Sequence, residues 1–313
     1  MNSKTPDTPH WDLGRIVTEL RQTRERWRAG RSRDFNSREF PSRDKIDQVC
    51  LLLRSALFPL RLGPADLRRE GEDFFVGHAL DSALTTLRCE VQLEISHLER
   101  SGDTPISDAQ ARQRAAEIVT AFANALPRLR QLLDTDVEAA FRGDPAARSV
   151  DEVLLCYPGV LALVHHRIAH ELYALGAPLI ARIVAELAHS ETGIDIHPGA
   201  TIGPHFFIDH GTGVVIGETA VIGQNVRLYQ HVTLGAKRFE TAEDGSLEKG
   251  QPRHPIVEDD VVIYAGATIL GRVTIGHGST IGGNVWLTRS LPAGSSITQA
   301  SSQSRDPHEN GSA

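Results

Sequence analysis

The sequence predicts an α+β fold in which a helical N-terminal bundle precedes a solenoid of short parallel strands. Three observations carry this prediction. Apolar residues recur at helical spacing up to about residue 190, aliphatic residues then recur at every sixth position, and 313 residues are enough for two domains. Aromatic residues make up only 5% of the chain while glycines number 27, so the core must be built mainly from aliphatic side chains.

The first domain, residues 11–190, is predicted to be a helical scaffold. Residues 1–10 are polar and are expected to be disordered, and the irregular segment 30–42 has the composition of a linker. Ser107 can cap a helix, which Pro127 is expected to kink or break. We expect most of the helices to pack and to support oligomerisation rather than chemistry. The other predicted helices span residues 11–29, 44–58, 71–99, 149–156, 158–175 and 178–189.

A six-residue period organises the second domain. This period fits neither an α-helix nor a single strand, but it fits a left-handed parallel β-helix of hexapeptide repeats, in which three hexads form one coil and every side of the prism points one aliphatic residue inward. The pattern predicts about four or five coils over residues 191–291, followed by a polar C-terminal tail at 292–313. The thirteen aliphatic positions are Ile196, Ile202, Ile208, Ile216, Ile222, Leu228, Leu234, Val257, Ile263, Ile269, Ile275, Ile281 and Leu287.

Two interruptions of the hexad register indicate where function lies. The step from Ile208 to Ile216 is eight residues instead of six, and it contains the run Asp-His-Gly-Thr-Gly at 209–213. A polar insertion at 237–254 then separates two hexads, and it ends in the run Pro-Arg-His-Pro at 252–255. Insertions in a solenoid form loops on one face and often carry function.

The residues at these interruptions suit proton abstraction from a small anionic substrate. Asp195 lies fourteen residues before Asp209, within one coil's length, so we expect Asp195 and His210 to face the same groove. A carboxylate that orients an imidazole, with a second imidazole (His254) and a guanidinium (Arg253) nearby, suits general-base activation of a hydroxyl. The alternative is that His210 is a solvated turn residue and that Arg253 only holds its loop.

Three segments of the prism resemble the serine O-acetyltransferases, a hexapeptide-repeat acyltransferase family. They read TGIDIHPGA at 192–200, FIDHGTGVVIGETA at 207–220 and YQHVTLGA at 229–236. The likeness extends upstream to the segments that join the family's helical domain to its prism, namely 143–147, 153–159 and 166–170. It covers roughly residues 140 to 290, whereas residues 1–140 match only as an extended helical N-terminal region.

The resemblance implies a reaction and a catalytic pair. Members of the family transfer an acetyl group from acetyl-CoA to the hydroxyl of L-serine, which gives O-acetyl-L-serine and CoA in the first step of cysteine biosynthesis from serine. His210 matches the general base, and Asp195 matches the carboxylate that orients it. Attack on the thioester is direct, and no metal is expected because acetyl-CoA already supplies an activated acyl group.

The resemblance also implies binding residues for both substrates. In the family's serine pocket a carboxylate takes the ammonium group, while arginine and histidine hold the carboxylate. The residues that match this pocket are Asp144, Asp209, Arg253 and His254. The pantetheine of CoA lies in a groove between the prisms of adjacent subunits, and the small residues that match its contacts are Ala236, Ala265 and Gly283.

Partners follow from the same resemblance. L-cysteine, which is serine with a thiol, is expected to inhibit by occupying the serine pocket, and the expected assembly is a homotrimer or a hexamer made of two trimers. Many members bind O-acetylserine sulfhydrylase through a terminal isoleucine, but this chain ends in a polar tail, 306–313, without one, so that complex is not expected. The charged loop 237–251 is expected to act as a lid over the CoA groove.

Composition excludes some function classes. The chain has 33 Lys and Arg against 40 Asp and Glu, a net charge of −7, which disfavours nucleic-acid and membrane-surface binding. Cys50, Cys89 and Cys156 form no metal or redox spacing and favour a reducing cytoplasm. No uninterrupted run of 18 apolar residues suggests a membrane span.

Three alternatives remain at this point. A zinc enzyme of the γ-carbonic anhydrase type would need three convergent ligands on the same kind of prism, and His205, His210 and His231 are the candidates. A hexapeptide acetyltransferase for a sugar or another acceptor is the second alternative. A catalytically silent protein that regulates cysteine synthesis is the third, and the intact Asp195, His210 and Arg253 argue against it.

Overall fold

The computed structural model describes residues 11–29, 40–99, 107–238 and 250–300. The chain divides into two units, Met1–Glu39 and Phe40–Ala313, which are described separately. The predictions for residues 1–10, for most of the linker 30–42, for the lid at 239–249 and for the tail from 301 onward lie outside the described residues.

The first unit contributes one described helix, α1 (Leu13–Ala29). Its apolar side chains recur at helical spacing, and none of its residues is buried. Leu13, Ile16 and Leu20 are among the exposed apolar residues.

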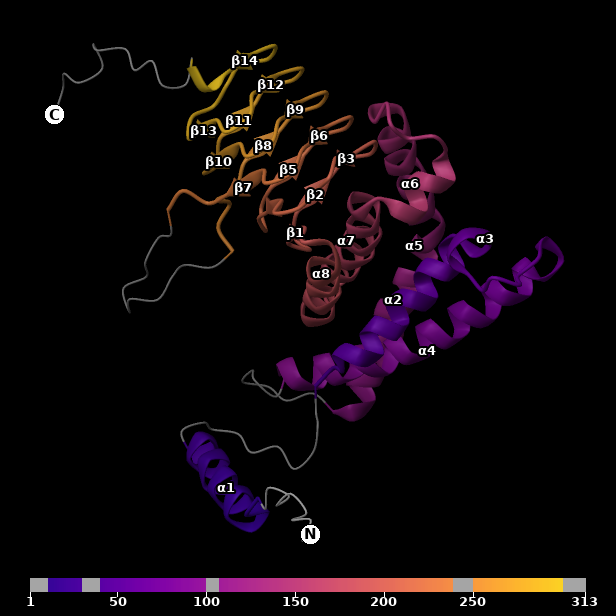
Figure 1. Ribbon diagram of the computed structural model, residues 1–313. Coiled ribbons are helices and arrows are strands. Elements are labelled where there is room, and N and C mark those ends of the chain that lie inside the picture. Colours follow the sequence, from indigo (N-terminus) through magenta and orange to yellow (C-terminus); the bar gives the residue numbers. More distant parts are fainter. Residues whose placement is uncertain (1–10, 30–39, 100–106, 239–249, 301–313) are drawn as a thin grey trace, which may run out of the picture. The chain divides into compact units, whose positions relative to one another are not determined.

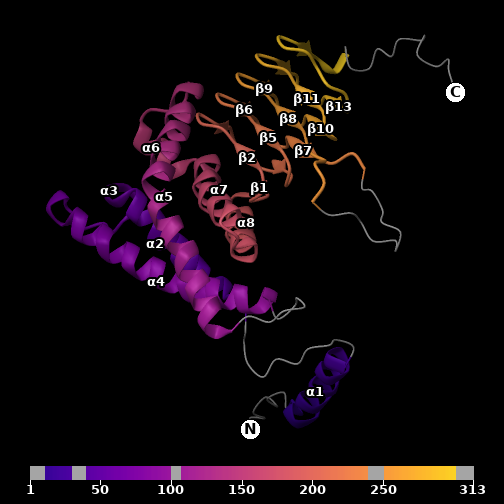
Figure 2. The same cartoon turned by 180° about the vertical axis from the view of Figure 1, so that it is seen from behind.

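The second unit begins with a bundle of helices (Figures 1 and 2). Its helices are α2 (Arg43–Leu57), α3 (Pro59–Leu62), α4 (Glu72–Glu99), α5 (Asp108–Gly143), α6 (Val150–Cys156), α7 (Pro158–Ala174) and α8 (Pro178–Thr192), with a 3-10 turn at Arg69–Gly71. α2, α4, α5, α7 and α8 share one apolar core, built mostly from Leu, Ile, Val and Ala. None of the described helices is long and apolar enough to cross a membrane.

The predicted break at Pro127 does not occur. Ser107 caps α5 with a capping box, as the sequence suggested, but the helix then runs through Pro127 to Gly143. Proline removes one helical hydrogen bond. Buried Leu126 and Leu129, on either side of Pro127, pack into the bundle core and hold the helix together across this position.

α8 is fixed by a buried carboxylate from another helix. Its N-cap residue is Ala177, which has no side chain that could cap the helix. Glu94 of α4 takes this role, because its two carboxylate oxygens accept hydrogen bonds from the backbone N–H groups of Leu179 (2.6 Å) and Ile180 (2.9 Å). Burial raises the pKa of Glu94, and these two hydrogen bonds partly offset the rise. The carboxylate thus sets the position of the helix that leads into the first strand.

The strands form a left-handed parallel β-helix, as the hexad register predicted. The strands are β1 (Asp195–Ile196), β2 (Thr201–Ile202), β3 (Phe207–Ile208), β4 (Val215–Ile216), β5 (Val221–Ile222), β6 (Arg227–Leu228), β7 (Thr233–Gly235), β8 (Ile256–Val257), β9 (Val262–Ile263), β10 (Thr268–Leu270), β11 (Thr274–Ile275), β12 (Thr280–Ile281), β13 (Trp286–Leu287) and β14 (Ser296–Ile297). They pair in parallel in three sheets: β1-β4-β7-β10-β13 (sheet A), β2-β5-β8-β11 (sheet B) and β3-β6-β9-β12-β14 (sheet C). All thirteen predicted aliphatic residues are buried in the prism.

The prism extends beyond the predicted boundary at residue 291. β14 pairs with β12 in sheet C, and Leu291 forms a bridge to Ile275. The sequence assigned the segment from residue 292 onward to the tail, and Ile297 does not continue the six-residue register from Leu287.

Three corners connect the sheets, and the chain passes through them in the order A–B, B–C and C–A. Turns of this kind need a residue in the left-handed region, which glycine adopts freely and Asn, Asp and His adopt more readily than most other residues. Within the described residues, the non-glycine positions with positive φ all lie at the B–C and C–A corners: His205, His210, Asn225, His231, Asp260 and Asn284.

A buried ion pair joins the helices to the first coil. Arg167 of α7 pairs with Asp136 of α5 at 3.1 Å, and both side chains are almost fully buried. The same guanidinium donates to the backbone carbonyls of Ile202 and Gly203 in the prism. The bundle and the first coil are therefore held in one fixed arrangement.

The buried ring of His166 in α7 provides a test of this packing. Neither ring nitrogen has a hydrogen-bond partner among the described residues. Burial and the neighbouring Arg167 hold the pKa of His166 well below its usual value. Since a buried polar group without a partner costs about 1–3 kcal/mol, we expect His166→Leu to raise the free energy of unfolding by about 1 kcal/mol at neutral pH.

The pH dependence of this effect has a definite sign. Below a pH of about 6.5 the unfolded chain protonates His166 while the folded chain does not, so the wild type loses stability as the pH falls. The His166→Leu variant has no such group, so its free energy of unfolding should fall less than that of the wild type as the pH is lowered. Urea unfolding at two pH values measures both effects, with the exposed His277→Leu as the control. A His166→Leu variant that is less stable than the wild type would contradict the prediction, because it would show that the His166 ring makes a stabilising contact.

Candidate active site

The predicted site residues lie at two different corners of the prism. The first set, which we call the His210 group, lies at the C–A corner and the adjacent ends of the helices, and consists of Asp144, Tyr157, Asp209, His210 and Arg227. The second set, the Arg253 group, lies at and beside the A–B corner, and consists of Asp195, His197, Glu218, Arg253 and His254. No hydrogen bond or ion pair joins the two groups within the described part of one chain.

His210 projects from the turn that has two extra residues. Its side chain is 71% exposed, with Nε2 3.8 Å from Oδ1 of Asp209. Asp209 is buried, and its other oxygen, Oδ2, accepts a hydrogen bond from Arg227 at 2.6 Å. The group thus presents an accessible imidazole beside a carboxylate that is already held in place.

Asp144 is brought to the same corner by the helices. It ends α5, and Tyr157 connects α6 to α7. The Tyr157 hydroxyl donates to Oδ2 of Asp144 at 2.5 Å, and the N–H of Ala146 donates to Oδ1 at 2.8 Å. The Tyr157 hydrogen bond is the main reason that the pKa of Asp144 is lowered, and it raises the pKa of Tyr157 to about 12. Asp144 is therefore an anion near His210.

Gly159 explains how closely the helices approach this corner. A Cβ atom at this position would lie 2.3 Å from the carbonyl oxygen of Ile208, the residue before Asp209. Only glycine allows α7 to begin directly against β3. This contact places Tyr157, two residues earlier, beside the His210 turn.

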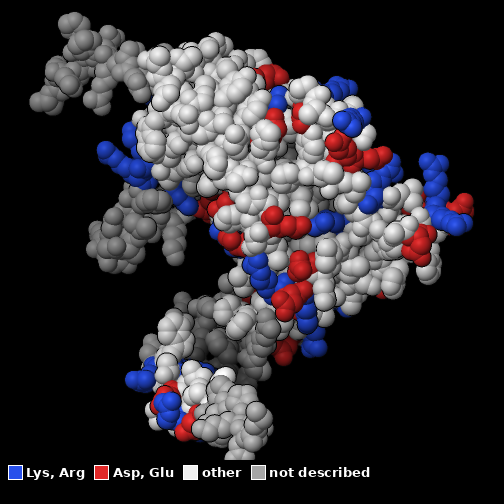
Figure 3. Space-filling model, viewed as in Figure 1, with Lys and Arg blue, Asp and Glu red and all other residues white. Residues whose placement is uncertain are grey.

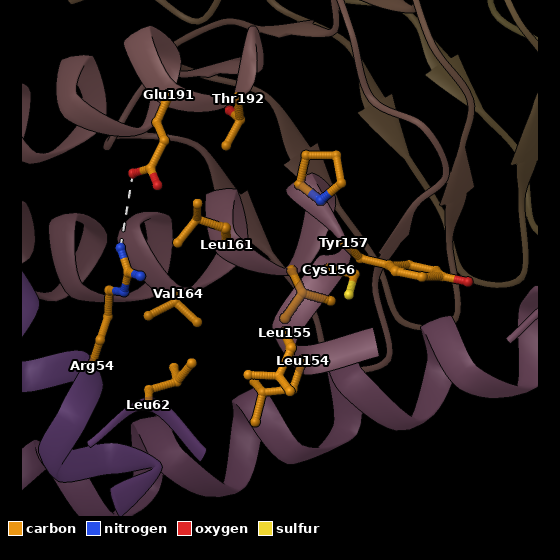
Figure 4. Close-up of a pocket in the computed structure, with 12 residues that line it drawn as sticks. Arg54, Leu62, Leu154, Leu155, Cys156, Tyr157, Leu161, Val164, Glu191 and Thr192 are labelled. Atoms are coloured by element: carbon orange, nitrogen blue, oxygen red, sulfur yellow. Dashed lines mark ion pairs between the residues drawn. The ribbon is translucent and has the colours of Figure 1, made fainter. Parts of the chain in front are cut away.

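Tyr157 also borders a cavity of about 250 Å³ in the helical bundle. The cavity lies among α2, α3, α6, α7 and the end of α8, and an ion pair of 3.8 Å between Arg54 and Glu191 crosses it (Figure 4). Figure 4 shows the ring of Tyr157 pointing away from the other side chains that line this space. Tyr157 is the one member of the His210 group that lines the cavity.

Arg227 was not predicted from the sequence. Its guanidinium lies between the rings of Phe207 (4.9 Å) and Tyr229 (4.6 Å), and Tyr229 stacks on Tyr264 with centroids 5.0 Å apart. The cation–π contacts hold the guanidinium against Asp209. The only signal in the sequence was its position as the outward residue of β6, and such positions are commonly charged.

Arg253 is held by Glu218. Its NH2 group donates to Oε2 of Glu218 at 2.7 Å, and the hydroxyl of Tyr173 donates to Oε1 at 3.2 Å. Burial opposes the charge on Glu218, but the hydrogen bond from Arg253 and the nearby His197 outweigh it, so the pKa of Glu218 is lowered. Neither Glu218 nor Tyr173 was predicted as a site residue.

His254 is a neutral hydrogen-bond donor. Burial, followed by the charge of Arg253, lowers the pKa of His254 to about 4. Its Nδ1 accepts a hydrogen bond from the backbone N–H of Thr219 at 3.1 Å, so the hydrogen-bond network assigns the ring proton to Nε2. A Cβ atom at Gly217 would lie only 2.0 Å from the ring, so glycine is needed there.

The structure does not bring Asp195 to His210 within one chain, contrary to the expectation of a shared groove. Asp195 lies on β1, which leads to the A–B corner, and its carboxylate is within 4.8 Å of ligand-type atoms of Glu186 and His189. Within one chain the two residues lie apart because fourteen residues are not a whole coil. The residue that pairs with Asp195 in the next coil is Val215, twenty residues later.

The three small residues expected to contact CoA divide in the same way. Ala236 follows β7 at the A–B corner, whereas Ala265 and Gly283 follow β9 and β12 at the C–A corner. Ala265 and Gly283 are stacked, because a Cβ atom at Gly283 would lie 3.2 Å from the carbonyl oxygen of Ala265. These two small residues therefore lie on neighbouring coils at the C–A corner, the corner that also carries His210.

The three candidate zinc ligands do not lie at a single corner of one chain. His205 lies at the B–C corner, while His210 and His231 lie at the C–A corner. Among the residues that the structure describes, the one group with metal-ligand spacing is Glu186, His189 and Asp195, which contains none of these three histidines.

Charges are concentrated near the first coils. Figure 3 shows Lys, Arg, Asp and Glu gathered over the helices and the adjacent part of the prism, whereas the coils around β12 and β14 are nearly free of charge in this view. Arg227 and Arg253 each form an ion pair with a carboxylate, Asp209 and Glu218 respectively.

The prism of hexapeptide coils defines the class of the protein. Residues 254–289 match the family described as "Bacterial transferase hexapeptide (six repeats)", so this part of the prism carries the repeat of the hexapeptide transferases.

Closer relatives define the family. The chain is 58% identical over 272 residues to "Serine acetyltransferase, plasmid" of Synechococcus elongatus. The aligned residues make up 87% of this chain and 85% of the relative. The chain therefore belongs to the serine acetyltransferase family and is an acyltransferase.

Solved structures agree with this assignment. Serine acetyltransferase 1 of Entamoeba histolytica in complex with L-cysteine has a TM-score of 0.70 and 37% identity, with 80% of this chain and 86% of that chain covered. Serine acetyltransferase of Brucella abortus in complex with coenzyme A has a TM-score of 0.51 and 28% identity, with 81% and 93% covered.

Proposed function

We propose that this enzyme transfers the acetyl group of acetyl-CoA to the hydroxyl of L-serine in a site formed between two copies of the chain. The observation that carries the proposal is the division of the site residues between two corners. The His210 group contains a base and two carboxylates, and the Arg253 group contains the donors for a carboxylate. Each group is incomplete alone, and a neighbouring copy would supply the other.

The charges suit a serine zwitterion. The carboxylates of Asp144 and Asp209 would take the ammonium group, and the lowered pKa of Asp144 keeps it charged for this role. Arg253 and the Nε2–H of His254 would hold the substrate carboxylate. A neutral His254 favours this arrangement, because it can donate a hydrogen bond at neutral pH without first taking up a proton.

Catalysis would then proceed through His210. Its unprotonated ring nitrogen removes the proton of the serine hydroxyl as the oxygen attacks the thioester carbonyl carbon. The tetrahedral intermediate collapses with cleavage of the C–S bond, and the imidazolium returns the proton to the leaving thiolate of CoA. Asp195 of the neighbouring copy is proposed to orient the imidazole, since within one chain Asp195 belongs to the Arg253 group.

CoA and cysteine complete the proposal. We place the pantetheine along Ala236, Ala265 and Gly283, and the binding of coenzyme A by the Brucella abortus relative supports acetyl-CoA as the co-substrate. L-cysteine carries the same ammonium and carboxylate groups as serine, and the Entamoeba histolytica relative binds it. We therefore propose that cysteine competes for the serine pocket.

Assembly and location belong to the same proposal. In a closed trimer each C–A corner would meet the A–B corner of the neighbouring copy, so every site would be complete, and pairing of two trimers through the helices would give a hexamer. Cys50, Cys89 and Cys156 are all free, which suits the reducing cytoplasm. A complex with O-acetylserine sulfhydrylase is not proposed.

A thiol-release assay tests the function. The purified protein is given acetyl-CoA with a panel of amino acids and sugars, and release of CoA is measured. We expect release with L-serine and inhibition by L-cysteine that added serine relieves. Release with a sugar but not with serine would reject the proposed acceptor, and unchanged activity at millimolar cysteine would reject the proposed inhibition.

A further inference from the structure

Tyr173 lies outside both groups of the proposed site, but a single carboxylate connects it to Arg253. Tyr173 is in the last turn of α7. Its hydroxyl donates to Oε1 of Glu218 at 3.2 Å, while Arg253 donates to Oε2 of the same carboxylate at 2.7 Å. One oxygen of Glu218 is thus held by the helical bundle, and the other holds the guanidinium.

The surroundings of this connection keep it rigid and charged. The ring of Tyr173 packs edge-on against His197, with centroids 5.8 Å apart. The side chains of Glu218 and Arg253 are 24% and 26% exposed, so the ion pair is largely shielded from solvent. The lowered pKa of Glu218 means that this carboxylate is ionised at neutral pH.

Arg253 depends on this carboxylate for its orientation. An arginine side chain is long and flexible, and it recognises a carboxylate well only when its planar fork is held in one direction. A second hydrogen bond of the guanidinium, from NH1 to the carbonyl oxygen of Gln251, is long at 3.3 Å. Glu218 is therefore the stronger of the contacts that the structure gives for this group.

We propose that Tyr173 is a positioning residue for substrate recognition, which fixes Glu218 and thereby orients Arg253 toward the carboxylate of serine. This inference rests on the proposed function, where Arg253 binds that carboxylate. It assigns part of the substrate affinity to α7, a helix outside the prism.

Steady-state kinetics of Tyr173→Phe test the inference. Removal of one hydrogen bond should raise the KM for L-serine about fivefold, while kcat and the KM for acetyl-CoA stay within about twofold of the wild type. Glu218→Leu should raise the serine KM further. The double variant should match Glu218→Leu alone, because leucine has no acceptor for the Tyr173 hydroxyl. With L-serinamide, which has no carboxylate, Tyr173→Phe should behave as the wild type does.

Arg128→Met is the matched control. It removes an ion pair of 2.5 Å from Glu171, another residue of α7 that touches neither group of the site, and should leave the serine KM unchanged. An unchanged serine KM in Tyr173→Phe, or an equal rise with serinamide, would overturn the positioning role. Wild-type protein that fails to acetylate serine would reject the proposed function itself, so the two failures are distinguishable.

Discussion

His210→Ala should lower kcat for acetyl transfer to serine by about a thousandfold, since a general base contributes between about 10² and 10⁴ to the rate. The KM values for serine and acetyl-CoA should change little, because the ammonium, the carboxylate and the pantetheine are assigned to other residues. The exposed His210 side chain makes few contacts in one chain, so the variant should fold. The measurement is CoA release at saturating substrates.

The control for this variant is His277→Ala. His277 is also an exposed turn histidine beside an aspartate, 3.5 Å from Asp260, but it lies at the B–C corner, away from both groups. It should retain wild-type kcat. Serine-dependent CoA release that survives His210→Ala at the wild-type rate would remove His210 as the base, and the histidines of the Arg253 group would become the candidates.

Two inactive variants should restore activity when they assemble together. Chains with His210→Ala and chains with Arg253→Met each lack one group of the proposed site. In mixed oligomers some interfaces combine the intact Arg253 group of one chain with the intact His210 group of another. With equal amounts and random assembly, about a quarter of the sites are complete, so activity should rise from near zero to about a quarter of the wild-type value.

Co-expression of the two chains in equal amounts, followed by purification through one affinity tag that both chains carry, provides the randomly assembled oligomers. The control combines wild-type chains with chains that carry both substitutions. A site between copies predicts about a quarter of wild-type activity in this control, whereas a site within one chain predicts about half. Mixed single variants that stay as inactive as their parents would contradict a shared site.

The six-residue period made the prism predictable. Each side of a narrow coil admits one inward side chain, so the requirement for an aliphatic residue repeats at a fixed interval and is visible without any long-range information. All thirteen predicted positions are buried. The last part of the prism was missed because Ile297 follows an irregular turn and falls out of register with Leu287.

The site was only partly predictable. The two register breaks marked His210 and Arg253, because extra residues must leave the prism at those points. The corner of the prism at which each break lies depends on how the coils stack. The expectation that Asp195 lies beside His210 was made without this information. The link between Tyr157 and Asp144 could not be inferred, since it depends on how α6 and α7 pack against β3.

Helix α5 shows a limit of a different kind. The conformational rule for Pro127 was applied correctly, but it describes an isolated helix. In the folded chain, burial of Leu126 and Leu129 outweighs the loss of one hydrogen bond. Local rules for helix termination are reliable only where tertiary packing is weak.

The buried Arg167 has a consequence for solubility. The first coil of any β-solenoid carries backbone carbonyl and N–H groups with no further coil to pair with, and such an edge can recruit strands from other molecules. The guanidinium of Arg167 occupies two of these carbonyls, on Ile202 and Gly203, and the N–H of Phe206 donates to Asp136. The helical bundle thus covers the edge of the first coil and satisfies backbone groups that could otherwise pair with strands of other molecules.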